Sequence, residues 1–409
     1  MKIEFPHFLV ALTQWLIVVV TVMLNRLSSR QRRWLVIAAY ILFVLAVPFV
    51  MGAVLSSGAY SVGLNIIIKA GYFAIAALGL NLIVGYCGLL NLGFAGFMLI
   101  GSYTAGILMK QYEFSFWTAA LVSVLHGAFW GIVLGLPTLR LTGDYFAIVT
   151  FGFGELVYML ARNWVSLTRG PGGYPGVPRP SMDLTWMHKL GVPADVNLNL
   201  QFTVVGKNQN VFLYWYLVAF LLGLTMFFTE RLWRSRLGRA WAALREDETA
   251  AEACGINGRW YKTIAFALSA GIGALAGAFE VSFSTMADFR NYDFMMSVSV
   301  LAYLVLGGMG TVKGSVLGAF VLVGLGELLR KSPAVYFSYL FEGWWPGAAQ
   351  WLTALPWLPD MRMILYGIIL VIMIRFRPEG LLPSRSRARE LNRDDDAPAQ
   401  DNPLFQLRA

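Results

Sequence analysis

The sequence predicts an all-α polytopic integral membrane protein of about 11 transmembrane helices, some of them interrupted by glycine. Three observations lead to this fold class. The chain has 409 residues and is 57% hydrophobic but only 13% charged, whereas about a quarter of the residues of a soluble domain are charged. Its apolar residues come in runs of about 20, the length of a helix that crosses a bilayer. Glycine clusters separate some runs, and a continuous helix costs about 1 kcal/mol per glycine there.

Apolar runs define the spans in order along the chain. The first run is not a cleaved signal peptide, because it lacks a small-residue cleavage site and is followed by four arginines between Arg26 and Arg33. Gly127, Gly131 and Gly135 repeat every four residues within one run and provide a flat face for close helix packing. The predicted spans are 8–24, 34–55, 62–84, 93–109, 116–136, 145–161, 211–229, 263–283, 294–310, 315–329 and 361–376.

Basic residues orient these spans, because cytoplasmic loops carry an excess of lysine and arginine. The arginines at 26–33 place the first loop in the cytoplasm and the N-terminus outside. Eleven crossings then carry residues 230–262 and the C-terminal tail to the cytoplasm. Residues 230–262 hold seven of the 32 lysines and arginines, and the chain from Arg375 onward holds another seven. The predicted organisation is a two-span extension over 1–61, a core over 62–383 with an outer loop 162–210 and the cytoplasmic loop 230–262, and a disordered cytoplasmic tail over 384–409.

Two glycine-rich stretches, Gly85–Phe97 and Gly307–Phe320, lie between apolar runs, one in each half of the chain. Paired interrupted spans are typical of a transport path between pseudo-repeats. Tight turns between helices are the alternative explanation, with nearly equal weight. The residues that we predict on the path are Gly85, Gly88, Asn91, Gly93, Glu155, Gly307, Gly308 and Gly310.

Glu155 belongs to this set because an ionisable side chain at bilayer depth is a functional candidate. It lies in the middle of its predicted span. Glu280 and Glu327 lie nearer to span ends, where we expect them to reach water, and Lys69 is a candidate partner.

Several kinds of chemistry have no support in the sequence. No Gly-x-x-x-x-Gly-Lys-Ser/Thr loop occurs, so the chain is not expected to bind ATP by itself. The three histidines, His7, His126 and His188, form no metal-ligand pattern, and His126 is expected to be a hydrogen-bonded core residue. Cys87 and Cys254 are too isolated for a disulfide framework. The net charge of +9 follows from loop orientation and does not indicate a nucleic-acid partner. No metal, no cofactor and no enzymatic activity are therefore predicted.

The cytoplasmic loop contains an alanine-rich segment with both charge signs, from Ser235 to Asn257. Its composition favours a helix over 240–254, bounded by Gly238 and Gly255, with Gly255 as a C-terminal cap. A short helix held between two spans can dock in the groove of a partner protein, although a solvated charged face is the simpler explanation.

Six segments of the chain, in order within 62–383, resemble one known family: Gly85–Phe97, Leu139–Glu155, Thr168–Pro180, 238–256, Val305–Gly310 and Phe376–Leu382. The family is that of the inner-membrane permeases of branched-chain amino acid ABC importers, of the LivM type. The resemblance implies the ABC importer permease fold, with 62–383 as the permease core.

The resemblance also implies that the helix in the cytoplasmic loop couples to an ATPase. Many such permeases carry Glu-Ala-Ala-x-x-x-Gly there. Ala250, Ala251 and Gly255 match this spacing, but Thr249 replaces the acid and Glu248 stands one place earlier. The predicted coupling residues are Gly238, Arg239, Arg245, Glu246, Asp247, Glu248, Ala250, Ala251 and Gly255.

The implied complex contains a LivH-type permease, two ATPase subunits of the LivG/LivF type that bind ATP and Mg²⁺, and a periplasmic amino-acid-binding protein. Its implied location is the bacterial inner membrane, and its implied cargo is leucine, isoleucine and valine. Urea, amides and other small amino or carboxylic acids are alternative cargoes, because nothing in the spans distinguishes them. An ion-coupled secondary transporter is a further alternative, supported only by the few membrane acids.

Overall fold

Residues 64–330 account for most of the described part of the computed structural model. Contacts between Cα atoms divide the chain into two units, Met1–Gly63 and Leu64–Ala409, and the described residues of the first are helical. The predicted span 8–24 lies outside the described residues, as do most of 34–55 and 361–376 and all of 384–409. The structure describes residues 40, 44–50, 57–138, 144–183, 199–201, 211–330, 367, 368, 371, 375 and 380–382.

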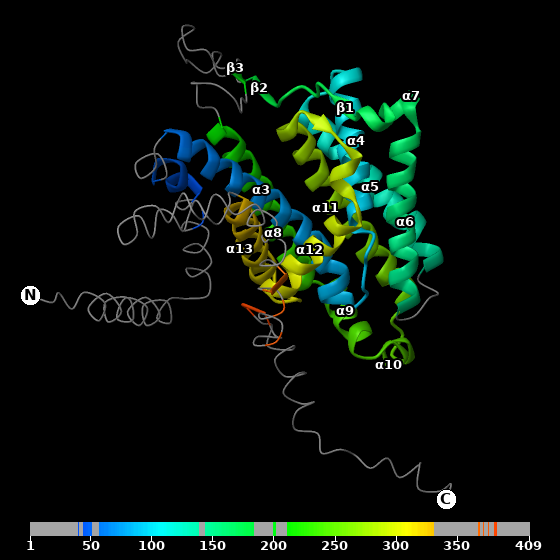
Figure 1. The fold of residues 1–409 in the computed structure, drawn as a ribbon. Helices are drawn as coiled ribbons and strands as arrows, with labels where there is room; N and C mark the ends of the chain where they lie inside the picture. The colour runs from blue at the N-terminus through cyan, green and yellow to red at the C-terminus, as the bar shows by residue number, and fades with distance from the viewer. Residues whose placement is uncertain are drawn as a thin grey trace, which may run out of the picture. The chain divides into compact units, whose positions relative to one another are not determined.

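Helices make up most of the described chain, as predicted (Figure 1). Each span predicted between 62 and 329 coincides with a helix. Among the described residues, five helices are long and apolar enough to cross a membrane, and a sixth crossing is possible if α12 and α13, which meet at 119°, count as one span. The count of 11 is therefore not confirmed. The long helices are α3 (Ser57–Asn81), α4 (Phe94–Gln111), α5 (Phe116–Thr138), α6 (Asp144–Asn163), α8 (Val211–Trp233), α11 (Gly258–Ser284), α12 (Phe294–Gly307) and α13 (Val312–Arg330).

Shorter elements join the long helices. Two antiparallel pairs of short strands occur, so the prediction of helices alone was incomplete: β1 (Tyr174–Pro175) pairs with β4 (Met286–Ala287), and β2 (Ser181–Asp183) with β3 (Asn199–Gln201). The remaining elements are the π-helix η1 (Leu82–Cys87), α7 (Val165–Thr168), the 3₁₀ helices η2 (Gly170–Gly172) and η4 (Phe289–Tyr292), α9 (Arg236–Glu246) and α10 (Glu248–Ala253).

The core is built around α11, which packs against α4 and α5. Small residues allow these helices to approach closely. A Cβ atom on Gly127 of α5 would lie 2.5 Å from Cβ of Ala274, and one on Gly131 would lie 2.7 Å from Cβ of Ala270. The flat glycine face predicted for α5 therefore packs against α11.

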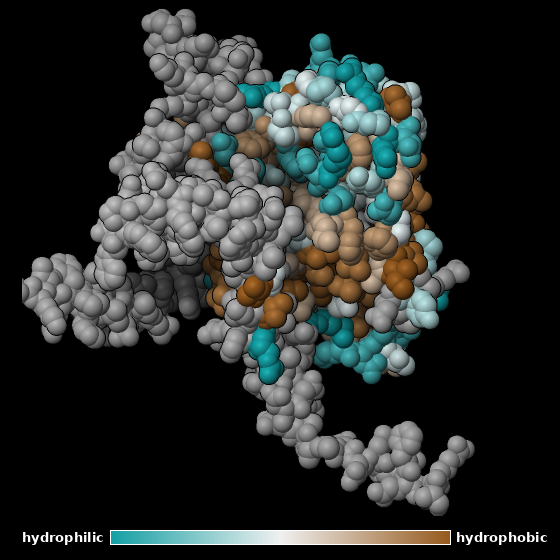
Figure 2. Space-filling view, viewed as in Figure 1, coloured by the Kyte–Doolittle hydropathy of each residue, from teal (hydrophilic) through white to brown (hydrophobic). Residues whose placement is uncertain are grey.

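Hydrophobic side chains also cover part of the outer surface. On the face shown in Figure 2, they form a zone between hydrophilic residues at its two ends. Leu121, Leu125 and Phe129 of α5 and Ile148 and Leu156 of α6 are all exposed. A zone of this kind suits contact with lipid chains or with another membrane subunit.

The described parts of the two predicted loops, 162–210 and 230–262, lie at opposite ends of the helices. Helix α8 runs from the end that carries β1 and β4 to the end that carries α9 and α10 (Figure 1). We refer to these as the strand end and the α9 end.

Candidate coupling site and path contacts

The segment at the α9 end is two helices rather than the single predicted helix over 240–254. Helix α9 begins after Ser235, whose Oγ accepts a hydrogen bond from the N–H of Leu237 at 3.1 Å. Asp247 interrupts the helical path, with φ −155° and ψ 112°, and its Oδ1 accepts a hydrogen bond from the N–H of Ala250 at 3.0 Å. Aspartate at such a position caps a new helix, because its side chain replaces the carbonyl missing in the first turn.

Of the two glycines predicted to bound the helix, Gly238 and Gly255, only Gly255 lies at a helix end. Gly238 is not a boundary but lies buried in the first turn of α9, where a Cβ atom would be 2.0 Å from the carbonyl oxygen of Trp233. Gly255 follows α10 with φ +84°, a left-handed conformation that favours glycine. The N–H of Ile256 then donates to the carbonyl of Ala251 at 3.1 Å, which closes the end of α10.

Helices α9 and α10 have a buried side and an exposed side. Trp241 is fully buried, and its Nε1–H donates to the carbonyl of Tyr261 on α11 at 2.8 Å. Glu248 forms an ion pair with Lys262 of α11, with Nζ and Oε2 2.5 Å apart. Among the predicted coupling residues, Gly238 and Ala251 are buried. The exposed ones are Arg239, Glu246, Asp247, Ala250 and Gly255.

Arg245 joins the coupling segment to the first glycine-rich stretch. Its Nη1 donates a hydrogen bond to the carbonyl oxygen of Gly85 in η1 at 2.7 Å. Gly88 follows η1 with φ +75°, and a Cβ atom there would lie 3.0 Å from Cγ of Arg245. Two groups of residues predicted from separate motifs are thus in direct contact.

The two glycine-rich stretches also meet, through Asn81. The Oδ1 of Asn81 accepts a hydrogen bond from the N–H of Gly310 at 2.9 Å. A Cβ atom on Gly85 would lie 1.9 Å from this Oδ1 and 2.7 Å from the nitrogen of Gly310. Asn81 is fully buried, and we did not predict a role for it, although an amide near the end of an apolar run was a usable signal.

Around Gly310, the second stretch is a tight turn between α12 and α13. Gly307 packs on the backbone of Gly314, where a Cβ atom would be 1.9 Å from the carbonyl oxygen, and Gly308 has φ +116°. The C-terminal segment Gly380–Leu382 adds to this turn. The N–H groups of Leu381 and Leu382 donate to the carbonyls of Leu306 and Gly307 at 2.8 and 2.9 Å. The backbone around Gly307–Gly310 is therefore a tight turn between two helices, which was the alternative explanation for these glycines.

Asn91 and Gly93 lie at a separate contact, between the start of α4 and α6. Asn91 accepts a hydrogen bond from the N–H of Gly93 at 3.0 Å. A Cβ atom on Gly93 would lie 1.8 Å from the carbonyl oxygen of Thr150 and 3.2 Å from the nitrogen of Gly154. Glu155 is the next residue of α6 and is half-buried.

Glu280 is buried rather than near water as we expected from its place in the sequence. It is 8% exposed, and its Oε2 has no hydrogen-bond partner among the described residues. The hydroxyl of Tyr292, in the 3₁₀ helix η4, interacts with this carboxylate. Burial raises the pKa of Tyr292 well above its ordinary value, so this hydroxyl remains a donor.

Glu327 of α13 forms an ion pair with Lys69 of α3, with Nζ and Oε1 2.6 Å apart and the side chains 32% and 18% exposed for Lys69 and Glu327. We expect Glu327→Gln to lower the free energy of unfolding by about 2 kcal/mol, between the values for exposed and fully buried pairs. Lys69→Met with Glu327→Leu should recover most of this loss, because neither charge is then left unpaired.

Thermal unfolding of the purified protein gives the stability of the single and the double variant relative to the wild type. Glu230→Gln is the control, since it breaks the exposed pair between Glu230 and Arg234, where a loss of at most about 0.5 kcal/mol is expected. A double variant less stable than Glu327→Gln would contradict the prediction.

The segment Thr168–Pro180 folds at the strand end around Tyr174. Cationic groups of Lys110 and Arg169 lie 5.1 and 5.3 Å from the centre of its ring. Lys110 also donates a hydrogen bond to the carbonyl of Pro175. Tyr174 pairs with Ala287 in the short sheet of β1 and β4, which ties this segment to the end of α11.

The described residues contain no group of three His, Cys, Asp or Glu side chains placed to hold a metal ion. His126 is hydrogen-bonded, as expected, but its side chain is exposed, so it is not the core residue that the sequence predicted. Its Nε2 accepts from Nε1 of Trp130 at 2.8 Å, and its Nδ1 lies 2.8 Å from Oγ1 of Thr104.

Comparison with known proteins decides the family. The family described as branched-chain amino acid transport system / permease component matches residues 62–374. The chain belongs to this family.

Relatives support the same membership in this permease family. The high-affinity branched-chain amino acid transport system permease protein LivM of Escherichia coli K12 is 37% identical over 313 residues, which cover 76% of this chain and 68% of the relative. LivM of Salmonella typhimurium is 35% identical over 358 residues, covering 87% and 76%. The permease protein LivH of the same species is 27% identical over 276 residues, covering 64% and 82%. No solved structure matches the chain.

Proposed function

We propose that this chain is a transmembrane permease subunit of an ATP-driven ABC importer for branched-chain amino acids and forms the translocation path with a paralogous permease. The family and the LivM relatives support the transport class and the cargo. The observation that carries the mechanism is the hydrogen bond from Arg245 of α9 to Gly85 of the glycine-rich stretch. It connects a segment exposed at one end of the protein to backbone between the core helices.

The proposed energy source is a pair of separate ATPase subunits that dock at the α9 end. The exposed side of α9 and α10 offers Arg239, Glu246 and Asp247 to such a partner. The buried side is fixed to α11 by Trp241 and by the ion pair of Glu248. A helix held in this way moves as a rigid body, whereas a flexible loop would absorb the motion.

The proposed path for this motion runs from Arg245 to Gly85 and then through Asn81 to Gly310 at the α12–α13 turn. Each step is a hydrogen bond or a backbone contact. Displacement of α9 would therefore shift both glycine-rich stretches together. A periplasmic binding protein delivers the amino acid at the strand end, so the path itself need not bind its cargo tightly.

Charge reversal on the exposed side tests the coupling. We expect Glu246→Arg to uncouple ATP hydrolysis from leucine uptake, because like charges would replace a charge-assisted contact with the ATPase. Gly255→Leu should act in the same direction, since a leucine at φ +84° costs about 1–2 kcal/mol and displaces the end of α10.

A reconstituted complex allows ATPase activity and labelled leucine uptake to be measured together, with unlabelled valine, isoleucine and urea as competitors. Glu113→Arg, at an exposed residue between α4 and α5, is the matched charge-reversal control. Normal uptake by both variants with every subunit associated would refute the coupling assignment. Competition by urea but not by valine would refute the cargo.

The proposed orientation places the N-terminus in the periplasm and the C-terminus and the α9 end in the cytoplasm of a bacterial inner membrane. We expect a cysteine at Arg236 to be protected from an impermeant reagent added outside, and a cysteine at Glu113 to be labelled. The background is Cys87→Ala with Cys254→Ala. Labelling at Arg236 in sealed cells would reverse the orientation.

A further inference from the structure

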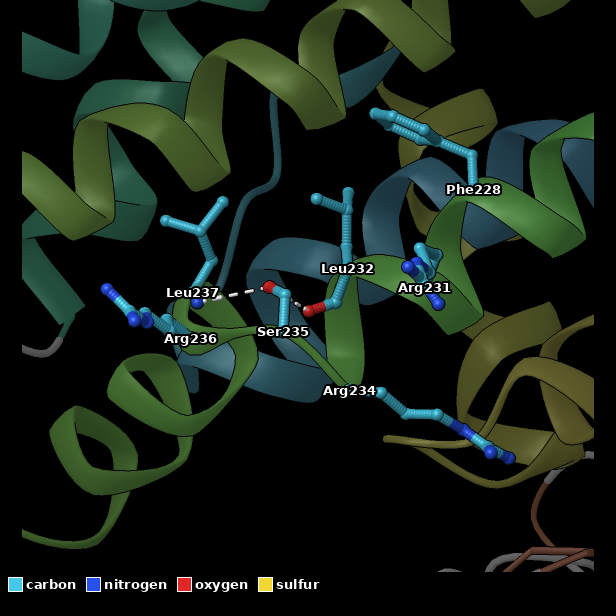
Figure 3. A pocket seen from close by; sticks show the side chains of 7 residues that line it. All are labelled: Phe228, Arg231, Leu232, Arg234, Ser235, Arg236 and Leu237. Carbon is cyan, nitrogen blue, oxygen red and sulfur yellow. Dashed lines mark hydrogen bonds between the residues drawn. The ribbon is translucent and has the colours of Figure 1, made fainter.

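An arginine-lined cavity lies where α8 ends and α9 begins. It has a volume of about 550 Å³ and is lined by Phe228, Arg231, Leu232, Arg234, Ser235, Arg236 and Leu237. Figure 3 shows the hydrogen bonds of Ser235 that hold its floor, from the N–H of Leu237 at 3.1 Å and to the carbonyl of Leu232 at 2.7 Å. A fixed turn therefore holds three arginines beside three apolar side chains.

The charge of this cavity is not balanced. Arg234 forms an ion pair with Glu230, in which Nη2 and Oε1 are 2.5 Å apart. Arg231 and Arg236 are exposed and have no acidic partner within 4 Å among the described residues. Figure 3 shows these two side chains on opposite sides of Ser235, so two unbalanced positive charges flank the cavity, and planar guanidinium groups suit phosphate oxygens.

An apolar stripe leads along α8 to the same cavity. Phe220, Leu224 and Phe227 are 58%, 52% and 69% exposed, and Phe228 is 42% exposed. Helical spacing of three and four residues places Arg231 on the turn directly below Phe227 and Phe228. At about 1.5 Å per residue the stripe runs about 12 Å along α8, most of the depth of about 15 Å of one leaflet, and it ends where a headgroup would lie.

We propose that this cavity binds the phosphate of an anionic phospholipid, whose acyl chain lies along the exposed side chains of α8. The apolar stripe favours a lipid over a free phosphate, which would need only the arginines. A protein partner is less suited, because the cavity continues into the surface of a membrane-spanning helix. Basic pockets at this depth bind anionic headgroups in other membrane proteins. The cytoplasmic leaflet is the location of this site if the proposed orientation holds. Lipid binding at the site does not depend on which amino acid the transporter carries.

The test uses the complete transporter, purified in phosphatidylcholine and titrated with phosphatidylglycerol, with bound lipid counted by native mass spectrometry. Each arginine near a phosphate contributes about fivefold in affinity. We therefore expect Arg231→Gln with Arg236→Gln to weaken binding about 25-fold. Arg259→Gln with Lys313→Gln removes two exposed charges outside the cavity and should leave the affinity unchanged. Lysine at both cavity positions should restore most of the binding.

Three results would overturn the proposal. The first is equal lipid retention by the cavity variant and the wild type. The second is displacement of the lipid by inorganic phosphate at similar concentrations, which would indicate a free anion as the ligand. The third is loss of the ATPase subunits from the cavity variant. Together with unchanged lipid retention, this loss would indicate that the arginines bind a protein instead of a lipid. Failure of lysine to restore binding would also count against a charge-based site.

Discussion

Gly93→Ala is expected to prevent stable folding of the permease, because the added methyl group has no space. A Cβ atom at this position would lie 1.8 Å from the carbonyl oxygen of Thr150 and 2.7 Å from its carbonyl carbon. These are backbone atoms of α6, so no side-chain rotation can relieve the clash and α6 would have to move away from the start of α4. Overpacking of a core costs about 1–3 kcal/mol even where side chains can adjust, and we expect a larger loss here.

Gly152→Ala is the matched control for this prediction. Gly152 lies on α6 between the contact residues Thr150 and Gly154 but about half a turn round the helix, and a Cβ atom there would meet nothing within 4 Å among the described residues. The control should be neutral or more stable by up to about 1 kcal/mol, because alanine favours a helix over glycine. The measurement is the amount of folded protein in membranes together with its thermal unfolding after purification. Equal stability of the two variants would show that α4 and α6 are not packed in this way.

This contact changes how glycine variants can test the path. From the sequence alone, Gly93→Leu or Gly310→Leu is expected to block uptake while the complex still assembles, because these glycines are predicted to flank the path. The backbone contact with Thr150 means that leucine would separate two helices first. Loss of uptake in Gly93→Leu would therefore report packing. A test of the path needs residues whose replacement keeps the helices in place, and Arg245 is one of these.

Most of the helical fold could be predicted because each bilayer crossing needs its own apolar run. This requirement places α3, α5, α6, α8 and α11 without knowledge of how they pack. The break at Asp247 was not predicted, because alanine-rich sequence on both sides favours one continuous helix and a single capping side chain outweighs that preference. The burial of Glu280 depends on segments that are distant in the sequence, and these cannot be read from its own apolar run. Tyr292 of η4, which packs against α4, α6 and α12, interacts with its carboxylate.

For the candidate site as well, the sequence identified individual residues, whereas the contacts between them depend on the fold. Glycine clusters identified Gly85 and Gly310 as unusual backbone, but only the fold shows that Asn81 bridges them. The charged loop identified Arg245 as a contact for an external partner. In the structure this side chain points inward to Gly85, because it lies on the same side of α9 as the buried residues Trp241 and Leu244.

Arg245→Met is expected to reduce amino acid uptake about tenfold or more while the complex assembles and retains its ATPase activity. Methionine keeps the apolar contact that the arginine stem makes near Gly88, but it cannot donate to the carbonyl of Gly85. A hydrogen bond from a charged donor contributes about 1.5–3 kcal/mol, which corresponds to a factor of about 10 to 150 in an equilibrium between two arrangements. If this bond links α9 to the glycine-rich stretch, its loss separates ATPase motion from the path.

The control is Arg239→Met on the same helix. The side chain of Arg239 is exposed at the α9 end, and among the described residues it makes only a long hydrogen bond of 3.4 Å to the carbonyl of Arg234. A defect in Arg239→Met that appears together with loss of the ATPase subunits would indicate docking, whereas the defect in Arg245→Met should appear with the subunits still bound. Arg245→Lys should recover part of the uptake, because lysine can donate to Gly85 with a less favourable geometry. Normal uptake by Arg245→Met would show that motion reaches the core by another route, of which the ion pair between Glu248 and Lys262 is the nearest alternative.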